Sequence, residues 1–144
     1  MKTFKLVSLQ VVEEEQLLDI ELVDGLIINQ ENDQGQWMIE AYMNKSYYDY
    51  FQKIAEQAQD LIVQVVITKK ANSPAAFQTK IMTIKLLENH ISILLQGKLM
   101  KTNNDYAVVV LKNLIEKDFA GRELLDEFKN ILRNKPPLTL ARSE

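Results

Sequence analysis

The sequence contains no cysteine, and only one histidine, four glycines and three prolines occur among its 144 residues. The lack of cysteine excludes disulfides, thiolate nucleophiles and cysteine-ligated zinc or iron–sulfur sites. The glycines are too few and too scattered to cradle a phosphate, and the sequence has no serine-hydrolase elbow, zinc-protease motif or dinucleotide fingerprint. No apolar run approaches the length of a transmembrane helix.

The chain also lacks a basic block, and its formal net charge is −3. Nucleic-acid binding proteins usually present a basic face, so no nucleic-acid partner is expected. A hydrophobic content of 47% and a charged content of 26% are typical of one soluble globular domain. Because the N-terminal residues are interrupted by polar side chains, we expect no signal peptide and a cytoplasmic location.

Alternation of apolar and polar residues predicts about eight β-strands. Residues 90–100 show it best, and Gly97 within them predicts a bulge or a tight bend. The pair Asp24-Gly25 predicts a hairpin turn, because type I′ turns need positive φ at both central positions. Residues 106–111 are apolar on both faces, which predicts a strand covered on both sides. The predicted strands are residues 3–12, 18–22, 26–29, 36–43, 61–68, 77–87, 90–100 and 106–111.

Two segments show helical spacing instead. Ser46, with Asp49 three residues later, predicts the start of a helix over residues 46–59. A second helix is predicted over residues 121–133. Residues 135–144 contain two adjacent prolines and predict a flexible tail, which leaves one domain over residues 1–134. Short strand connections favour an antiparallel barrel or sandwich with the helices packed on it.

Residues 1–7, 24–29 and 37–42 are similar to the YwpF-like family, small proteins of Gram-positive bacteria. The resemblance runs over most of the chain and is weakest in the last ten or so residues. It implies a mainly β (α+β) fold, with an antiparallel barrel core and a two-helix pair packed on it. The family's barrel resembles the tube-forming protein of type VI secretion systems. The resemblance implies no activity and no catalytic residue.

The residues themselves offer little chemistry. His90, the single histidine, is expected at a hairpin edge, where a surface role is usual. Asp19 and Glu21 lie roughly 7 Å apart if they share a strand face, a spacing suited to a two-carboxylate glycosidase. A solvated strand face explains them better, and a solvated hairpin tip explains the three glutamates at residues 13–15. We therefore expect no enzyme activity, metal or cofactor.

Two other groups of residues are candidates for binding nucleic acid. Four lysines would form a small basic patch if the predicted sheet brings them close together. Four aromatic side chains could stack on the bases of single-stranded nucleic acid. The acidic net charge disfavours both. The lysines are Lys69, Lys70, Lys80 and Lys85, and the aromatic residues are Trp37, Tyr47, Tyr48 and Tyr50.

The absence of a catalytic constellation and the presence of two amphipathic helices favour a non-enzymatic interaction or scaffold protein. A protein partner or self-association is expected, with a role in secretion or assembly suggested by fold analogy alone. The alternative is a small-molecule or lipid carrier with a ligand in the mouth of a hollow barrel. The predicted partner-binding helix surface consists of Tyr47, Tyr48, Phe51, Leu124 and Phe128.

Overall fold

The computed structural model describes residues 1–13 and 16–136 of the chain. Within these ranges there are seven β-strands, three α-helices and one 3₁₀ turn. The strands are β1 (Lys2–Val12), β2 (Leu17–Ile20), β3 (Leu22–Asn29), β4 (Gln36–Asn44), β5 (Leu61–Ile67), β6 (Ala75–Leu86) and β7 (His90–Leu99). The helical segments are η1 (Lys45–Tyr47), α1 (Tyr48–Glu56), α2 (Asn103–Glu116) and α3 (Gly121–Arg133).

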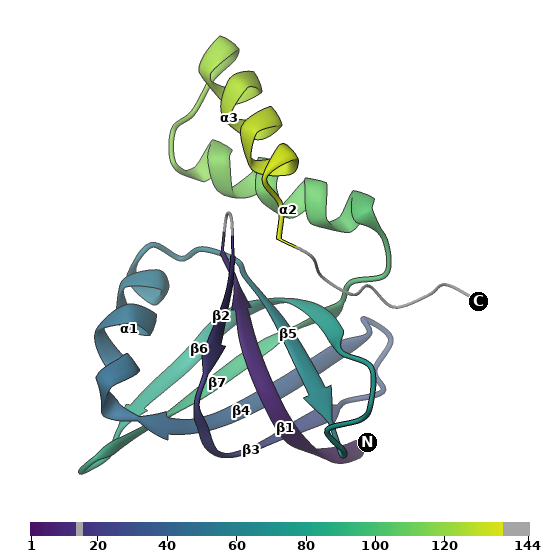
Figure 1. Ribbon diagram of the computed structural model, residues 1–144, viewed down its shortest axis with the longest axis vertical. Helices are drawn as coiled ribbons and strands as arrows, with labels where there is room; N and C mark the ends of the chain where they lie inside the picture. The colour runs from purple at the N-terminus through teal and green to yellow at the C-terminus, as the bar shows by residue number, and fades with distance from the viewer. Residues whose placement is uncertain (14–15, 137–144) are drawn as a thin grey trace.

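Six strands close into an antiparallel barrel (Figure 1). Neighbours follow the order β1-β3-β4-β7-β6-β5, and β5 pairs back onto β1 to complete the circle. β2 is an additional outer strand that pairs with the second half of β1, while β3 pairs with the first half. Glu21 separates β2 from β3, and its backbone N–H donates a hydrogen bond to the Tyr47 hydroxyl at 3.1 Å. The end of η1, where α1 begins, is thereby tied to the link between β2 and β3.

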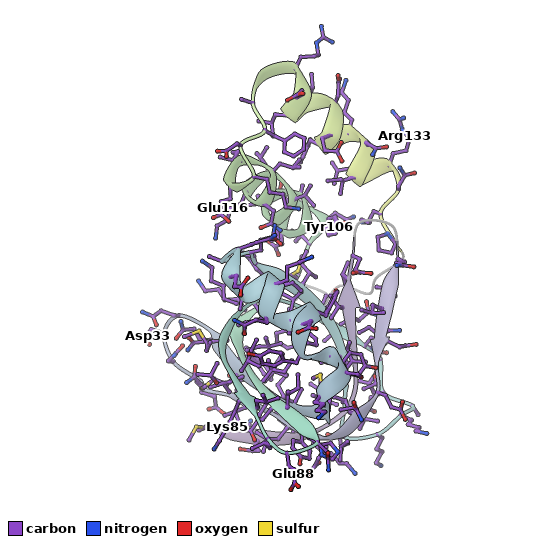
Figure 2. The ribbon with its side chains drawn as sticks, turned by 90° about the vertical axis from the view of Figure 1, so that its left-hand side faces the viewer. Asp33, Lys85, Glu88, Tyr106, Glu116 and Arg133 are labelled. Carbon is purple, nitrogen blue, oxygen red and sulfur yellow. The ribbon has the colours of Figure 1, made fainter. Side chains whose placement is uncertain are left out.

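Side chains fill the interior of the barrel, as is usual for small barrels. Phe77, Ile93 and Leu95 are at most 1% exposed. α1 lies along the side of the barrel, between the β6–β7 and β1–β2 hairpins, and buries Phe51 completely (Figure 2). The buried cluster consists of Leu6, Leu9, Val11, Ile20, Ile27, Ile39, Ala41, Met43, Phe51, Leu61, Val63, Val65, Phe77, Ile91, Ile93 and Leu95.

α2 and α3 form a pair that stands on one end of the barrel, with α3 on the side of α2 away from the strands (Figure 1). A second apolar cluster joins them to the barrel, and Ile62 of β5 belongs to it with Tyr106 and Ile131. Residues 61–65 of β5 are all buried, because one face meets the barrel core and the other meets this cluster. The described part of the chain has no helix long and apolar enough to cross a membrane.

The eighth predicted strand, residues 106–111, is wrong because these residues lie within α2. The helix starts at a capping box, in which the Thr102 hydroxyl accepts a hydrogen bond from Asp105 N–H and the Asp105 carboxylate accepts one from Thr102 N–H. Such a box satisfies backbone donors that a new helix leaves unpaired. Three consecutive valines (residues 108–110) favour a strand by propensity, but the capped turn and burial of one helix face outweigh that preference.

The predicted hairpin turn at Asp24-Gly25 is also wrong, because both residues lie inside β3. The pairing with β4 shifts register between Leu22 and Asp24, so the irregularity is a bulge rather than a turn. A Cβ atom on Gly25 would lie 2.8 Å from Leu6 Cδ2 and 3.0 Å from the Glu40 carbonyl oxygen. Glycine is therefore needed for close packing at this position.

The helix predicted over residues 46–59 is shorter, since α1 runs from Tyr48 to Glu56 after the 3₁₀ turn. The predicted Ser46 cap is also wrong, because the Asn44 side chain caps η1 by accepting a hydrogen bond from Ser46 N–H at 2.8 Å, and α1 itself has no side-chain cap. The helix predicted over residues 121–133 is confirmed as α3. Residues 137–144 of the predicted tail lie outside the described residues. Lys135 Nζ donates to Asn103 Oδ1 at 3.0 Å, so the chain still contacts α2 after α3 ends.

Candidate functional site

A cavity of about 250 Å³ lies where the helix pair meets the barrel. Its wall takes residues from the end of β1, from α1, from the link before β5, and from β5, α2 and α3. Apolar side chains make most of the lining, among them Val12, Ile62, Leu114 and Ile131. Figure 2 shows Tyr106, another lining residue, at this junction between the helices and the strands. The cavity is therefore outside the filled barrel interior.

Asp60 is the most buried charged group in this wall, with a side chain only 2% exposed. It precedes β5 and receives hydrogen bonds at Oδ2 from Gln78 Nε2 at 2.7 Å and from Lys112 Nζ at 3.0 Å. Lys80 Nζ lies 3.7 Å from the other carboxylate oxygen. Because Gln78 and Lys80 belong to β6 and Lys112 belongs to α2, the carboxylate links the barrel to the helix pair.

Two buried acceptor atoms in the same wall have no hydrogen-bond donor among the described residues. They are Asp60 Oδ1 and Asn113 Oδ1. The two residues are neighbours, since Asn113 Nδ2 donates to the Asp60 main-chain oxygen at 3.4 Å. Buried acceptors are usually satisfied, so this pair marks an incomplete polar network at the cavity.

Glu13 and Tyr50 are two further polar residues of the cavity lining. Glu13 directly follows β1, and Tyr50 belongs to α1. The Tyr50 hydroxyl donates to Glu13 Oε2 at 2.8 Å, and Gln16 Nε2 donates to Glu13 Oε1 at 3.1 Å. Burial first, and then the hydrogen bond to Glu13 and its negative charge, raise the pKa of Tyr50 above its ordinary value of 10.0. The local environment thus opposes additional negative charge.

The predicted partner-binding surface is not gathered into one face. Phe51 is fully buried in the barrel core, and Tyr47 and Tyr48 pack against that core. Leu124 and Phe128 pack against the second cluster, on the helix pair. These side chains serve two separate cores, so in this conformation they offer little surface to a partner. Partner binding itself stays a prediction.

The candidate chemical residues are also apart. His90 stacks on Tyr42 with ring centroids 4.9 Å apart. Asp19 accepts a hydrogen bond from Gln10 Nε2 at 2.8 Å, while Glu21 lies beyond the end of β2. Of the three glutamates at residues 13–15, only Glu13 lies within the described residues. No group of three or more histidine or acidic side chains within those residues is arranged to hold a metal ion.

The four lysines do not make one patch. Lys80 is engaged with Asp60, and Lys85 lies about 17 Å further along β6, judged from the strand rise. Figure 2 shows Lys85 at the end of the barrel opposite the helix pair, near Glu88. Trp37, proposed for base stacking, instead packs against Phe4 and Phe77 at centroid distances of 6.5 and 5.2 Å.

One exposed surface was missed by sequence reasoning. Val108, Leu111 and Ile115, called here the outer stripe, lie on α2 and are 56%, 38% and 54% exposed. Their spacing of three and four residues places them on one helix face. The sequence does contain a signal for this surface. Residues 106–111 are all apolar, and a helix formed by such a segment must place some of these side chains away from the core.

Comparison with known proteins agrees with this architecture. The model of the YwpF-like protein family matches residues 2–131. The uncharacterized protein YwpF of Bacillus subtilis (strain 168) is 35% identical over 136 residues, which cover 92% of this chain and all of that protein. A crystal structure of a hypothetical protein from Staphylococcus aureus superposes with a TM-score of 0.69 at 35% identity, covering 96% of this chain and 97% of that one. The likeness to the type VI tube protein is not confirmed by these relatives. The chain belongs to the YwpF-like family.

Proposed function

We propose that the protein is a non-enzymatic interaction protein and that it associates with a second copy of itself through the outer stripe. The observation that carries the proposal is the exposure of three branched aliphatic side chains on one face of α2. The opposite face of the same helix buries Tyr106, Val109 and Leu114. A helix that is apolar on both faces is normally covered on both. The outer stripe is therefore the surface that a partner is expected to cover.

The geometry of the stripe suits a second copy. Val108 and Ile115 lie three residues before and four residues after Leu111. When two such helices pack antiparallel about a two-fold axis, Val108 of each meets Ile115 of the other, and the two Leu111 side chains meet at the centre. The helix pair projects from one end of the barrel, which leaves the outer stripe on the part of the molecule away from most of the strands (Figure 1).

The test is the molecular mass in solution, measured by light scattering and sedimentation over a wide range of protein concentration. We expect a concentration-dependent dimer that is lost in Leu111→Glu. Val23→Glu is the matched control, because Val23 is 58% exposed on β3, outside the stripe. A protein that stays monomeric at every concentration, or a dimer that survives Leu111→Glu, overturns self-association through this face.

The alternative of a carrier with a hollow barrel has no support from the core, because buried side chains occupy the barrel interior. A ring or tube assembly rests on fold analogy alone, and the two-fold contact proposed here closes on itself instead. The cytoplasm stays the expected location.

A further inference from the structure

We propose that the cavity between the barrel and the helix pair binds a small amphipathic amine, with its ammonium group at Glu13 and its apolar body against α2 and β5. This site is separate from the outer stripe and does not depend on self-association. The argument rests on the size of the cavity, the charges in its wall and the acceptors that lack a donor.

The size and lining set the scale of the ligand. Pockets for drug-sized molecules usually measure about 300–1,000 Å³, so a cavity of about 250 Å³ suits a smaller ligand. The side chains of Val12, Ile62 and Leu114 in this wall are hydrocarbon and offer the body of a ligand an apolar surface. A short alkyl or aryl group gains free energy there by leaving water.

Glu13 is a carboxylate in the cavity lining that forms no ion pair within the described part of the chain. Its two carboxylate oxygens accept hydrogen bonds from Tyr50 and Gln16, which are both neutral donors. No cationic nitrogen of the described chain lies within 4.0 Å of this carboxylate. The other charged lining groups are Asp60, which has Lys112 and Lys80 beside it, and Lys117, which is exposed.

The acceptors without donors point the same way. Asp60 and Asn113 both line the cavity; Asn113 Oδ1 is buried without a hydrogen-bond donor, and Asp60 Oδ1 has only Lys80 Nζ beside it, at 3.7 Å. An ammonium group carries three donors and no acceptor, so it suits a wall in which acceptors are in excess. The Glu13 carboxylate, which accepts the Tyr50 hydrogen bond and after burial helps to raise the pKa of Tyr50, repels an added anion and so disfavours a carboxylate ligand.

The test compares hexylamine, hexanol and hexanoate, which share a six-carbon chain and differ in the head group. Binding to the full chain is measured by calorimetry and by amide chemical-shift changes at neutral pH. We expect hexylamine to bind more tightly than hexanol, hexanoate not to bind, and the shifts to cluster on α2 and the start of β5. Glu13→Gln keeps an acceptor for Tyr50 but removes the charge, and should weaken hexylamine binding about tenfold or more.

Two further variants keep the result interpretable. Val12→Phe fills part of the cavity and should weaken binding of hexylamine and hexanol alike, whereas Glu40→Gln removes an exposed charge on β4 and should change neither. Thermal unfolding checks that each variant is folded. The proposal is overturned if hexanoate binds in preference, which would assign the head group to Lys117. It is equally overturned if Glu13→Gln leaves hexylamine affinity unchanged, or if none of the three compounds binds.

Discussion

The carboxylate of Asp60 and the ammonium of Lys112 lie 3.0 Å apart and form the ion pair that joins the barrel to the helix pair. Asp60 is nearly inaccessible, whereas the Lys112 side chain is 42% exposed. The two residues therefore contribute differently. Loss of the lysine leaves a buried carboxylate with weaker partners, and loss of the carboxylate releases a lysine that water can solvate.

Lys112→Met is expected to lower the free energy of unfolding by about 1–2 kcal/mol, because a charged hydrogen bond to a buried acceptor is lost but Gln78 and Lys80 remain. Denaturant unfolding measures this change. Hydrogen exchange should accelerate in α2 and α3 more than in the barrel, because the contact holds the helix pair in place.

A double-mutant cycle with Asp60→Asn separates this pair from general effects of substitution. We expect a coupling free energy of about 1 kcal/mol between the two positions. Lys135→Met serves as a control lysine, because its ammonium contacts Asn103 and the Tyr106 ring rather than Asp60. Additive effects of Asp60→Asn and Lys112→Met would contradict the assigned role of the ion pair.

Tyr50 is expected to ionise above the ordinary tyrosine pKa of 10.0 when the folded protein is titrated with base, because burial and the neighbouring Glu13 carboxylate raise its pKa. The unfolded chain loses this proton near pH 10, whereas the folded chain keeps it. The stabilisation is therefore fully present below about pH 10 and is lost as pH rises further. Tyrosinate absorbance in the near ultraviolet should lose a component that titrates above pH 10 in Tyr50→Phe. A Tyr50→Phe titration that loses an early component instead would show that Tyr50 is not the buried group.

The period-two pattern predicts five strands to within two residues at each end, namely β1, β4, β5, β6 and β7. Each of them has one face toward the barrel core, and in β5 the other face is buried as well, against the helix pair. The two wrong predictions, a turn at Asp24-Gly25 and a strand over residues 106–111, come from sequence patterns that two different structures can produce. Glycine after aspartate indicates a turn, but Gly25 is needed where β3 passes close to Leu6. Consecutive valines indicate a strand, but in α2 they follow a capping box.

The cavity was beyond prediction from the sequence because its polar groups come from distant positions. Glu13, Tyr50, Asp60 and Asn113 span a hundred residues from first to last and meet only when α2 crosses the end of the barrel. Each is unremarkable within its own segment. The sequence also did not show that Tyr47, Tyr48 and Phe51 contact the barrel core, because their helical spacing alone does not say what the helix face meets.

Phe51→Ala is expected to destabilise the protein by about 3–5 kcal/mol, the usual cost of emptying a phenylalanine site in a core. Phe51 is 0% exposed and packs edge-on to Tyr50, with ring centroids 5.1 Å apart. Phe51→Leu should cost less, because it removes less volume. The measurement is the unfolding midpoint in denaturant. A small effect of Phe51→Ala, within the range of surface substitutions, would show that α1 does not seal the barrel core.

Glycine can be required because a side chain would clash or because the backbone has a positive φ. Gly97→Ala tests the first of these effects. The strand pairing continues through Gly97 on both sides, opposite Trp37 and Thr79, so the position is a close approach in a bent sheet and not a bulge. An added Cβ atom would clash with the Gln78 carbonyl oxygen. Because that atom belongs to the β6 backbone, Gly97→Ala forces the two strands apart and should cost about 3 kcal/mol or more.

Gly35 provides the comparison, because it has a φ of +63° and no atom within 4 Å of an added Cβ. Gly35→Ala should cost about 1–2 kcal/mol, the penalty for a left-handed conformation with no clash. Denaturant unfolding of both variants measures the difference. If Gly97→Ala costs no more than Gly35→Ala, the backbones of β6 and β7 have room to separate. The close approach at Gly97 would then not be the reason that glycine is needed there.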